Sequence, residues 1–160
     1  MLKNGQILEI SNAEVIFKNF AGRESDYNAA GSRNFGIKLD KEQAEVLASD
    51  GWKVKSYSSK DDPTDITYWM PVTVRYDRKP PRIYMRPGEN GPWSLLDEST
   101  VSLLDDAEIE KFDIAVTASY WERANGDNGF KTYAYEVYAT LRLTSFAMEY
   151  GIYGDMNNGD

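Results

Sequence analysis

Two long runs of strand-forming residues near the end of the chain constrain the fold most. Residues 112–123 (FDIAVTASYWER) and 130–143 (FKTYAYEVYATLRL) are rich in β-branched and aromatic side chains, which are enriched in strands. The segment between them, ANGDNG, consists mostly of Gly, Asn and Asp, which tolerate the positive φ angles of hairpin turns. The sequence therefore predicts a long antiparallel hairpin and a mainly β fold.

Shorter strand patterns precede this hairpin at residues 8–17, 34–39 and 52–57, and a long exposed loop is expected over residues 18–33. Two short helices are predicted between the strands. Asp40 and Gln43 have the spacing of a capping box, and Gly51 follows as the terminator. The second helical turn falls within residues 94–110, where Ser99 or Thr100 is the expected cap and Val101 and Leu104 share one side.

This inventory has no alternating strand–helix rhythm, which excludes a doubly wound parallel sheet. A mainly β (α+β) class fits, with an OB-like five-stranded Greek-key barrel, one or two short helices and hairpin extensions. Periodicity alone does not separate such a barrel from a β-sandwich. At 160 residues the chain fits one domain, expected to span residues 1–146 and to be followed by a C-terminal tail at 147–160.

The chain contains neither cysteine nor histidine. Disulfides, thiolate zinc sites, histidine general bases and Ser-His-Asp triads are therefore excluded, which disfavours an enzyme. Residues 124–129 have turn chemistry and match no phosphate-binding fingerprint, so no cofactor or metal is predicted. No run of about 18 apolar residues is present, and a cytoplasmic protein without a membrane partner is expected.

Residues 68–86, YWMPVTVRYDRKPPRIYMR, are predicted to form two strands of a hairpin around Pro80 and Pro81, and they reverse the charge balance of the chain. The whole sequence has 18 basic and 26 acidic residues and a formal net charge of -8, whereas this segment contains four arginines and one lysine against a single aspartate. Cations with aromatic rings suit a single-stranded nucleic acid. The same pattern also fits an ordinary hairpin with arginines in water and rings in the core. Binding further requires the acidic residues to be segregated, as the acidic block at 97–110 indicates.

The candidate binding residues are of two kinds. Nine cations are candidates for phosphate contacts: Arg33, Lys38, Lys53, Lys55, Arg75, Arg78, Lys79, Arg82 and Arg86. Seven rings are candidates for base stacking: Phe20, Tyr27, Trp52, Tyr76, Tyr84, Tyr120 and Trp121. For each cation the alternative is a solvated surface charge, and for each ring it is core packing. Strand alternation also predicts that Tyr133 and Tyr135 share one face with Val137.

Over roughly residues 10–141 the chain resembles the OB-fold single-stranded DNA-binding proteins of tailed phages and prophages. The resemblance is carried by ISNAEVIFKNFAGRESDYNAAGSRNFGIKLD, GWKVK, PVTVRYDRKPPRIYM, LLDESTVSLLDDAEIEKFDIAV and YWERANGDNGFKTYAYEVYATL. It implies a non-enzymatic protein that coats single-stranded DNA in the host cytoplasm during phage replication or recombination. An acidic C-terminus in such proteins can dock replication or recombination partners. Here Glu149, Asp155 and Asp160 would supply the charge, and a frayed terminus is the alternative.

Two other functions remain open from the residues themselves. Net acidity favours a phage structural or regulatory protein that uses an OB-like surface to bind another protein. For either function the sequence is compatible with a monomer or a homo-oligomer. A carboxylate-dependent nuclease ranks last, because its candidate ligands have no defined metal spacing and resemble an acidic helix face. Those ligands would be Asp97, Glu98, Asp105, Asp106, Glu108 and Glu110.

Overall fold

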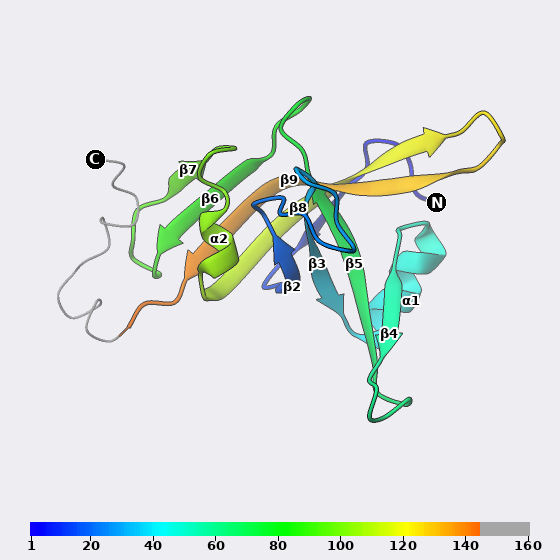
Figure 1. Ribbon diagram of the computed structural model, residues 1–160, viewed down its shortest axis with the longest axis horizontal. Coiled ribbons are helices and arrows are strands. Elements are labelled where there is room, and N and C mark those ends of the chain that lie inside the picture. Colours follow the sequence, from blue (N-terminus) through cyan, green and yellow to red (C-terminus); the bar gives the residue numbers. More distant parts are fainter. Residues whose placement is uncertain (145–160) are drawn as a thin grey trace.

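The computed structural model describes residues 1–144, which form one mixed sheet with two short helices (Figure 1). The predicted boundary between domain and tail, and the acidic residues of the tail, lie outside this range. The elements are β1 (Ile7–Ile10), β2 (Glu14–Asn19), β3 (Arg33–Leu39), α1 (Lys41–Asp50), β4 (Lys55–Ser58), β5 (Ile66–Val74), β6 (Arg82–Pro87), β7 (Ser94–Leu96), α2 (Leu103–Asp106), β8 (Ile109–Glu122) and β9 (Asn128–Leu141).

The main path of the sheet runs β1-β8-β9-β5-β3-β2, so its two ends are neighbours in the chain. The sequence predicts one strand at residues 8–17. The structure divides this region, because Asn12 adopts a positive φ of 52° and bends the chain between β1 and β2. At the bend the Ala13 N–H donates to the Phe112 carbonyl on β8 at 2.7 Å. β1 and β2 thus act as two halves of one bent strand that brings the two ends of the sheet together.

This arrangement is consistent with the predicted OB-like barrel. Its five core strands are the bent β1–β2 unit, β3, β5, β9 and β8, with β5 and β9 parallel where Thr73 meets Tyr133. β4 is added along β5, β6 is added along β9, and β7 is added along β6. One local prediction is wrong: β5 and β6 do not form a hairpin around Pro80 and Pro81. Among the described residues β6 pairs with β7 and, in parallel, with β9.

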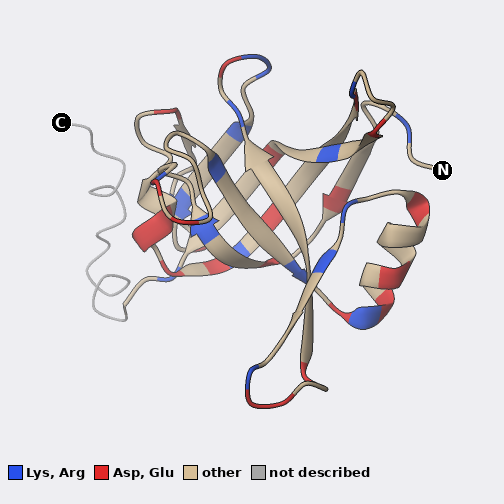
Figure 2. Cartoon of the chain, turned by 45° about the vertical axis from the view of Figure 1, so that its right-hand side comes forward, with Lys and Arg blue, Asp and Glu red and all other residues tan. Residues whose placement is uncertain are grey.

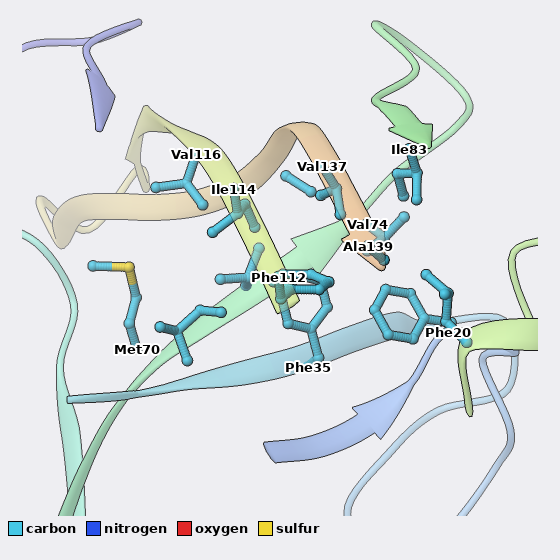
Figure 3. Close-up of a cluster of buried hydrophobic side chains, with 14 of the residues drawn as sticks. Phe20, Phe35, Met70, Val74, Ile83, Phe112, Ile114, Val116, Val137 and Ala139 are labelled. Carbon is cyan, nitrogen blue, oxygen red and sulfur yellow. The ribbon is translucent and has the colours of Figure 1, made fainter. Parts of the chain in front are cut away.

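The core lies inside the barrel, where side chains from β3, β5, β8 and β9 meet (Figure 3). Phe20 stacks on Phe35 with 4.8 Å between ring centroids and is 0% exposed. The Asp105 carboxylate accepts hydrogen bonds from the backbone N–H groups of Phe20 and Ala21. These bonds fix the backbone at the point where the Phe20 ring turns into the core. Phe20 is therefore a core residue, which corrects its prediction as a stacking ring.

Trp52 also belongs to the core, with 4% of its surface exposed, and its prediction as a stacking ring is likewise wrong. The cause lies at the end of α1. Gly51 takes a φ of 115°, and the Trp52 N–H then donates to the Leu47 carbonyl, so the chain turns back over the helix. At the other end of α1, the predicted capping box between Asp40 and Gln43 is present.

The second predicted helical turn is α2, with both Val101 and Leu104 buried as expected. Its cap differs from the prediction. The hydroxyl groups of Ser99 and Thr100 donate hydrogen bonds to the Asp97 carboxylate and are the main cause of its lowered pKa. The backbone N–H groups of the same two residues donate to this carboxylate as well. These two residues therefore complete a turn around Asp97 and do not cap the helix.

A β-bulge at Tyr135 changes the outward face of β9. Ala115 on β8 pairs with Glu136, whereas the next residue, Val116, pairs with Ala134. Tyr135 is thus the extra residue, and the side-chain alternation shifts by one beyond it. Val137 is consequently buried while Tyr133 and Tyr135 face outward. The predicted common face of the two tyrosines holds, but placing Val137 with them is wrong.

Candidate nucleic-acid interface

Two adjoining hollows lie at the end of the barrel where β3 begins and β5 ends. Their volumes are about 390 and 450 Å³, and both are lined by Arg75 and Tyr133, which makes them one continuous surface. We call this surface the β5–β9 groove. Its charged and aromatic lining residues are Arg33, Arg75, Arg78, Lys79, Lys131, Asp77, Glu98, Tyr76, Tyr133 and Tyr135.

The β5–β9 groove is basic although the chain is acidic. Five basic and two acidic side chains line it, whereas the whole sequence has 18 basic and 26 acidic residues. The loop after β5, at the top of Figure 2, carries part of this charge. A local excess of cations attracts phosphate groups even when the net charge of the protein is negative.

Arg75 occupies the middle of the groove and is paired with Asp77. Its Nε donates to Asp77 Oδ1 at 2.6 Å and its Nη2 donates to Oδ2 at 3.0 Å. These hydrogen bonds raise the pKa of Arg75 and lower the pKa of Asp77. Because both side chains are exposed to solvent, a phosphate can take the place of the carboxylate without desolvating a buried ion pair.

Two further arginines at the groove have carboxylate neighbours. Arg33 Nη2 lies 3.8 Å from Glu98 Oε1. Arg82 donates to Glu136 at 2.7 Å, and its Cζ lies 5.9 Å from the centre of the Tyr135 ring. The prediction that acidic residues are segregated from basic ones is therefore wrong at this surface. The register of β6 and β9 places Glu136 beside Arg82, and the loop residues Asp77 and Glu98 lie beside Arg75 and Arg33.

Tyrosines form the aromatic part of the groove. Tyr133 lies beneath Lys131, whose Nζ is 5.6 Å from the ring centre, and Tyr135 is exposed at the bulge. Tyr76 is half-buried, and this burial raises its pKa to about 12. Lys131, Tyr133 and Tyr135 are absent from the sequence-based candidates, although the repeated tyrosines of residues 130–138 were a signal that could have found them.

Two segments flank the groove. The loop between β2 and β3 presents Tyr27 fully exposed, and Asn28 Nδ2 braces this loop by donating to the Arg23 and Ser32 carbonyls. The β8–β9 hairpin extends away from the barrel (Figure 1) and carries exposed Tyr120 and Trp121. OB-fold proteins bind oligonucleotides with the corresponding two loops, so these three rings remain candidates for stacking.

The other predicted residues lie outside the groove. Lys38 and Lys55 flank Trp69 near the far end of β5, and Lys53 precedes β4. Tyr84 stacks on Tyr138, with 5.2 Å between centroids. Arg86 lies over Trp93, with 4.4 Å from Cζ to the ring centre. The structure thus gathers Arg33, Arg75, Arg78, Lys79 and Tyr76 in the groove and places Arg82 at its edge. The five residues Lys38, Lys53, Lys55, Tyr84 and Arg86 lie elsewhere on the outer surface.

The acidic block has contacts that explain its carboxylates structurally. Asp105 holds the start of the β2–β3 loop, Asp97 completes a turn, and Glu108 pairs with Arg142 at 3.1 Å. Within residues 1–144 no group of three or more potential ligands is arranged to hold a metal ion. In the same range, no helix has the length and apolar character needed to cross a membrane.

Residues 2–158 match the family model described as "Putative phage ssDNA-binding domain". The chain belongs to this family. This phage single-stranded DNA-binding family is the one that the sequence resembles, so that identification is confirmed. No curated protein matches the chain.

One solved structure supports the same fold for this member of the phage single-stranded DNA-binding family. It is a single-stranded DNA-binding protein from bacteriophage Enc34 in complex with ssDNA. It is 9% identical, with a TM-score of 0.54, and the match covers 91% of this chain and 95% of that one. A C-terminal truncation of the Enc34 protein is 8% identical with a TM-score of 0.48, covering 90% and 94%. At such identities the likeness concerns the fold alone.

Proposed function

We propose that this phage single-stranded DNA-binding protein holds its DNA in the β5–β9 groove, largely without sequence preference. The observation that carries the proposal is the coincidence of a basic excess with outward tyrosines in an otherwise acidic chain. Cations neutralise phosphates, and rings stack on unpaired bases regardless of their identity. The groove also lies between the two loops with which OB folds bind oligonucleotides.

The biological setting follows from the family. Single-stranded DNA arises during phage replication and recombination in the host cytoplasm, and we place the protein there as a non-catalytic coat. Family membership supports binding rather than catalysis, and the Enc34 protein was solved with single-stranded DNA. Docking of replication or recombination proteins to the acidic tail, and assembly into a homo-oligomer, are further parts of this proposal.

The test is a titration of fluorescent oligo(dT), and of a duplex of equal length, at two salt concentrations. If all five groove cations contact phosphates, a plot of the logarithm of the binding constant against the logarithm of the salt concentration has a slope of about -3.5. The binding constant then falls by about 100-fold between 50 and 200 mM salt. We expect clear preference for the single strand. Equal affinity for the duplex, or a flat salt response, would contradict the proposal.

The groove carboxylates give a second prediction. Asp77→Asn should strengthen oligo(dT) binding by about 2- to 5-fold, because it frees the Arg75 guanidinium and removes a charge that repels phosphate. Asp61→Asn is the matched control, since it removes the same charge in the β4–β5 loop at the opposite end of β5. Weaker binding by Asp77→Asn would mean that Asp77 orients Arg75 for the DNA and does not compete with it.

A further inference from the structure

A second aromatic cluster lies on the outer surface of the barrel, away from the groove. Phe17 on β2 contacts both Tyr57 on β4 and Trp69 on β5, with ring centroids 5.0 Å apart for Phe17 and Trp69 and 5.8 Å apart for Phe17 and Tyr57. Phe17 and Tyr57 are 52% and 47% exposed. We call these three residues the Phe17 cluster. Its rings face solvent and are not part of the barrel core.

The Phe17 cluster and the β5–β9 groove share one face of the sheet. Along β5, Met70, Val72 and Val74 point into the core, so Trp69, Thr73 and Arg75 point outward. Trp69 belongs to the cluster, and Thr73 and Arg75 line the groove. At about 3.3 Å per residue, Trp69 and Arg75 are roughly 20 Å apart along the strand. A single-stranded DNA that crosses this face can therefore contact both the Phe17 cluster and the β5–β9 groove.

The backbone is conformationally strained at the Phe17 cluster. Phe17 has a φ of 53°, a left-handed conformation that is a genuine outlier for a bulky residue, and it lies in a register shift between Ile16 and Asn19. A Cβ at Gly36 would lie 2.7 Å from Trp69 Cε3, so the indole rests directly on the backbone of β3. Strain of this kind persists mainly at functional positions.

Cations flank the cluster on both sides. In the sheet register Trp69 lies opposite Lys38 on β3 and opposite Lys55 on β4. Lys55 Nζ is 5.5 Å from the centre of the Trp69 ring, and Lys38 Nζ is 3.5 Å from the Glu14 carboxylate. Exposed rings between two lysines match the alternation of bases and phosphates in a single strand.

We propose that the Phe17 cluster is a second base-stacking platform, which extends the DNA path from the β5–β9 groove along the outer face of β5. The proposal rests on the proposed function, because it assumes that the groove holds single-stranded DNA. Lys38 and Lys55 contact the phosphates of the nucleotides that stack on the cluster.

The test compares oligo(dT) of about 4 and about 12 nucleotides, lengths within the usual range for one OB fold. Phe17→Asn removes the ring, and asparagine tolerates the positive φ, so the thermal midpoint should not fall. We expect the long oligonucleotide to bind roughly 5- to 150-fold more weakly, as for loss of a stacked ring, and the short one to bind unchanged at the groove. Phe17→Tyr keeps a ring and should bind both lengths like the parent protein.

Salt provides a second readout. Phe17→Asn should leave the salt slope unchanged, whereas Lys55→Ala should reduce its magnitude by about 0.7. Unchanged affinity of Phe17→Asn for the long oligonucleotide would overturn the platform and leave the cluster as a surface for another partner. Equal loss at both lengths would also overturn it, because the ring would then act on the groove or the fold. If the parent protein binds neither length, the proposed function itself fails.

Discussion

Replacing Arg75 and Arg82 together by glutamate should abolish oligo(dT) binding at low salt while the thermal unfolding transition remains. Arg75 is at the centre of the β5–β9 groove and Arg82 at its edge beside Tyr135. Each substitution removes a phosphate partner and adds a repelling carboxylate next to one already there, Asp77 or Glu136. Both arginines are exposed, and surface substitutions of this kind usually change stability by no more than about 0.5 kcal/mol.

The matched control replaces Lys111 and Arg142 together by glutamate. These cations are also exposed and also paired with carboxylates, Asp113 and Glu108, so the double change alters the net charge equally but lies outside the groove. It should weaken binding only slightly. Comparable losses in the two double variants would show that net charge, and not the groove, governs binding. Loss of the thermal transition in the Arg75 and Arg82 variant would show that these arginines are structural.

The barrel was predictable because its determinants are local in sequence. The turn residues at 124–129 and the strand-forming runs on both sides specify the β8–β9 hairpin, and Asp40, Gln43 and Gly51 specify α1. The bend that divides β1 from β2 was not predictable, because nothing in the strand pattern marks Asn12 as the residue with positive φ.

The groove was predictable only in part. Arg75, Arg78 and Lys79 lie within a few residues of one another, so their common location follows from sequence. Arg82 pairs with Glu136, 54 residues away, through the parallel register of β6 and β9, which no local pattern encodes. Composition therefore suggested segregated charges where the fold brings opposite charges together.

The direction of the aromatic side chains was the other feature that the sequence did not predict. Whether an aromatic ring is buried or exposed depends on bulges and caps, which shift the alternation by one residue. Phe20 turns into the core beside Asp105, while Phe17, three residues earlier, turns outward at a register shift. Likewise the bulge at Tyr135 separates two outward tyrosines from the buried Val137.

Those two tyrosines give the last prediction. Replacing Tyr133 and Tyr135 together by alanine should weaken oligo(dT) binding by about 30- to 10⁴-fold, since loss of a stacking ring costs about 1–3 kcal/mol per base and each 1.4 kcal/mol is tenfold. Their outward orientation predicts little loss of stability. Equilibrium titration at fixed salt measures the effect.

The matched variant carries phenylalanine at both positions, which keeps the rings and removes only the hydroxyls. It should bind nearly as well as the parent protein. The alanine variant should also retain the salt slope of the parent protein, because no cation is lost. The Arg75 and Arg82 variant should not retain this slope, because it loses two cations. If the phenylalanine variant binds as weakly as the alanine variant, the hydroxyls hold the DNA, and the rings are not a stacking surface.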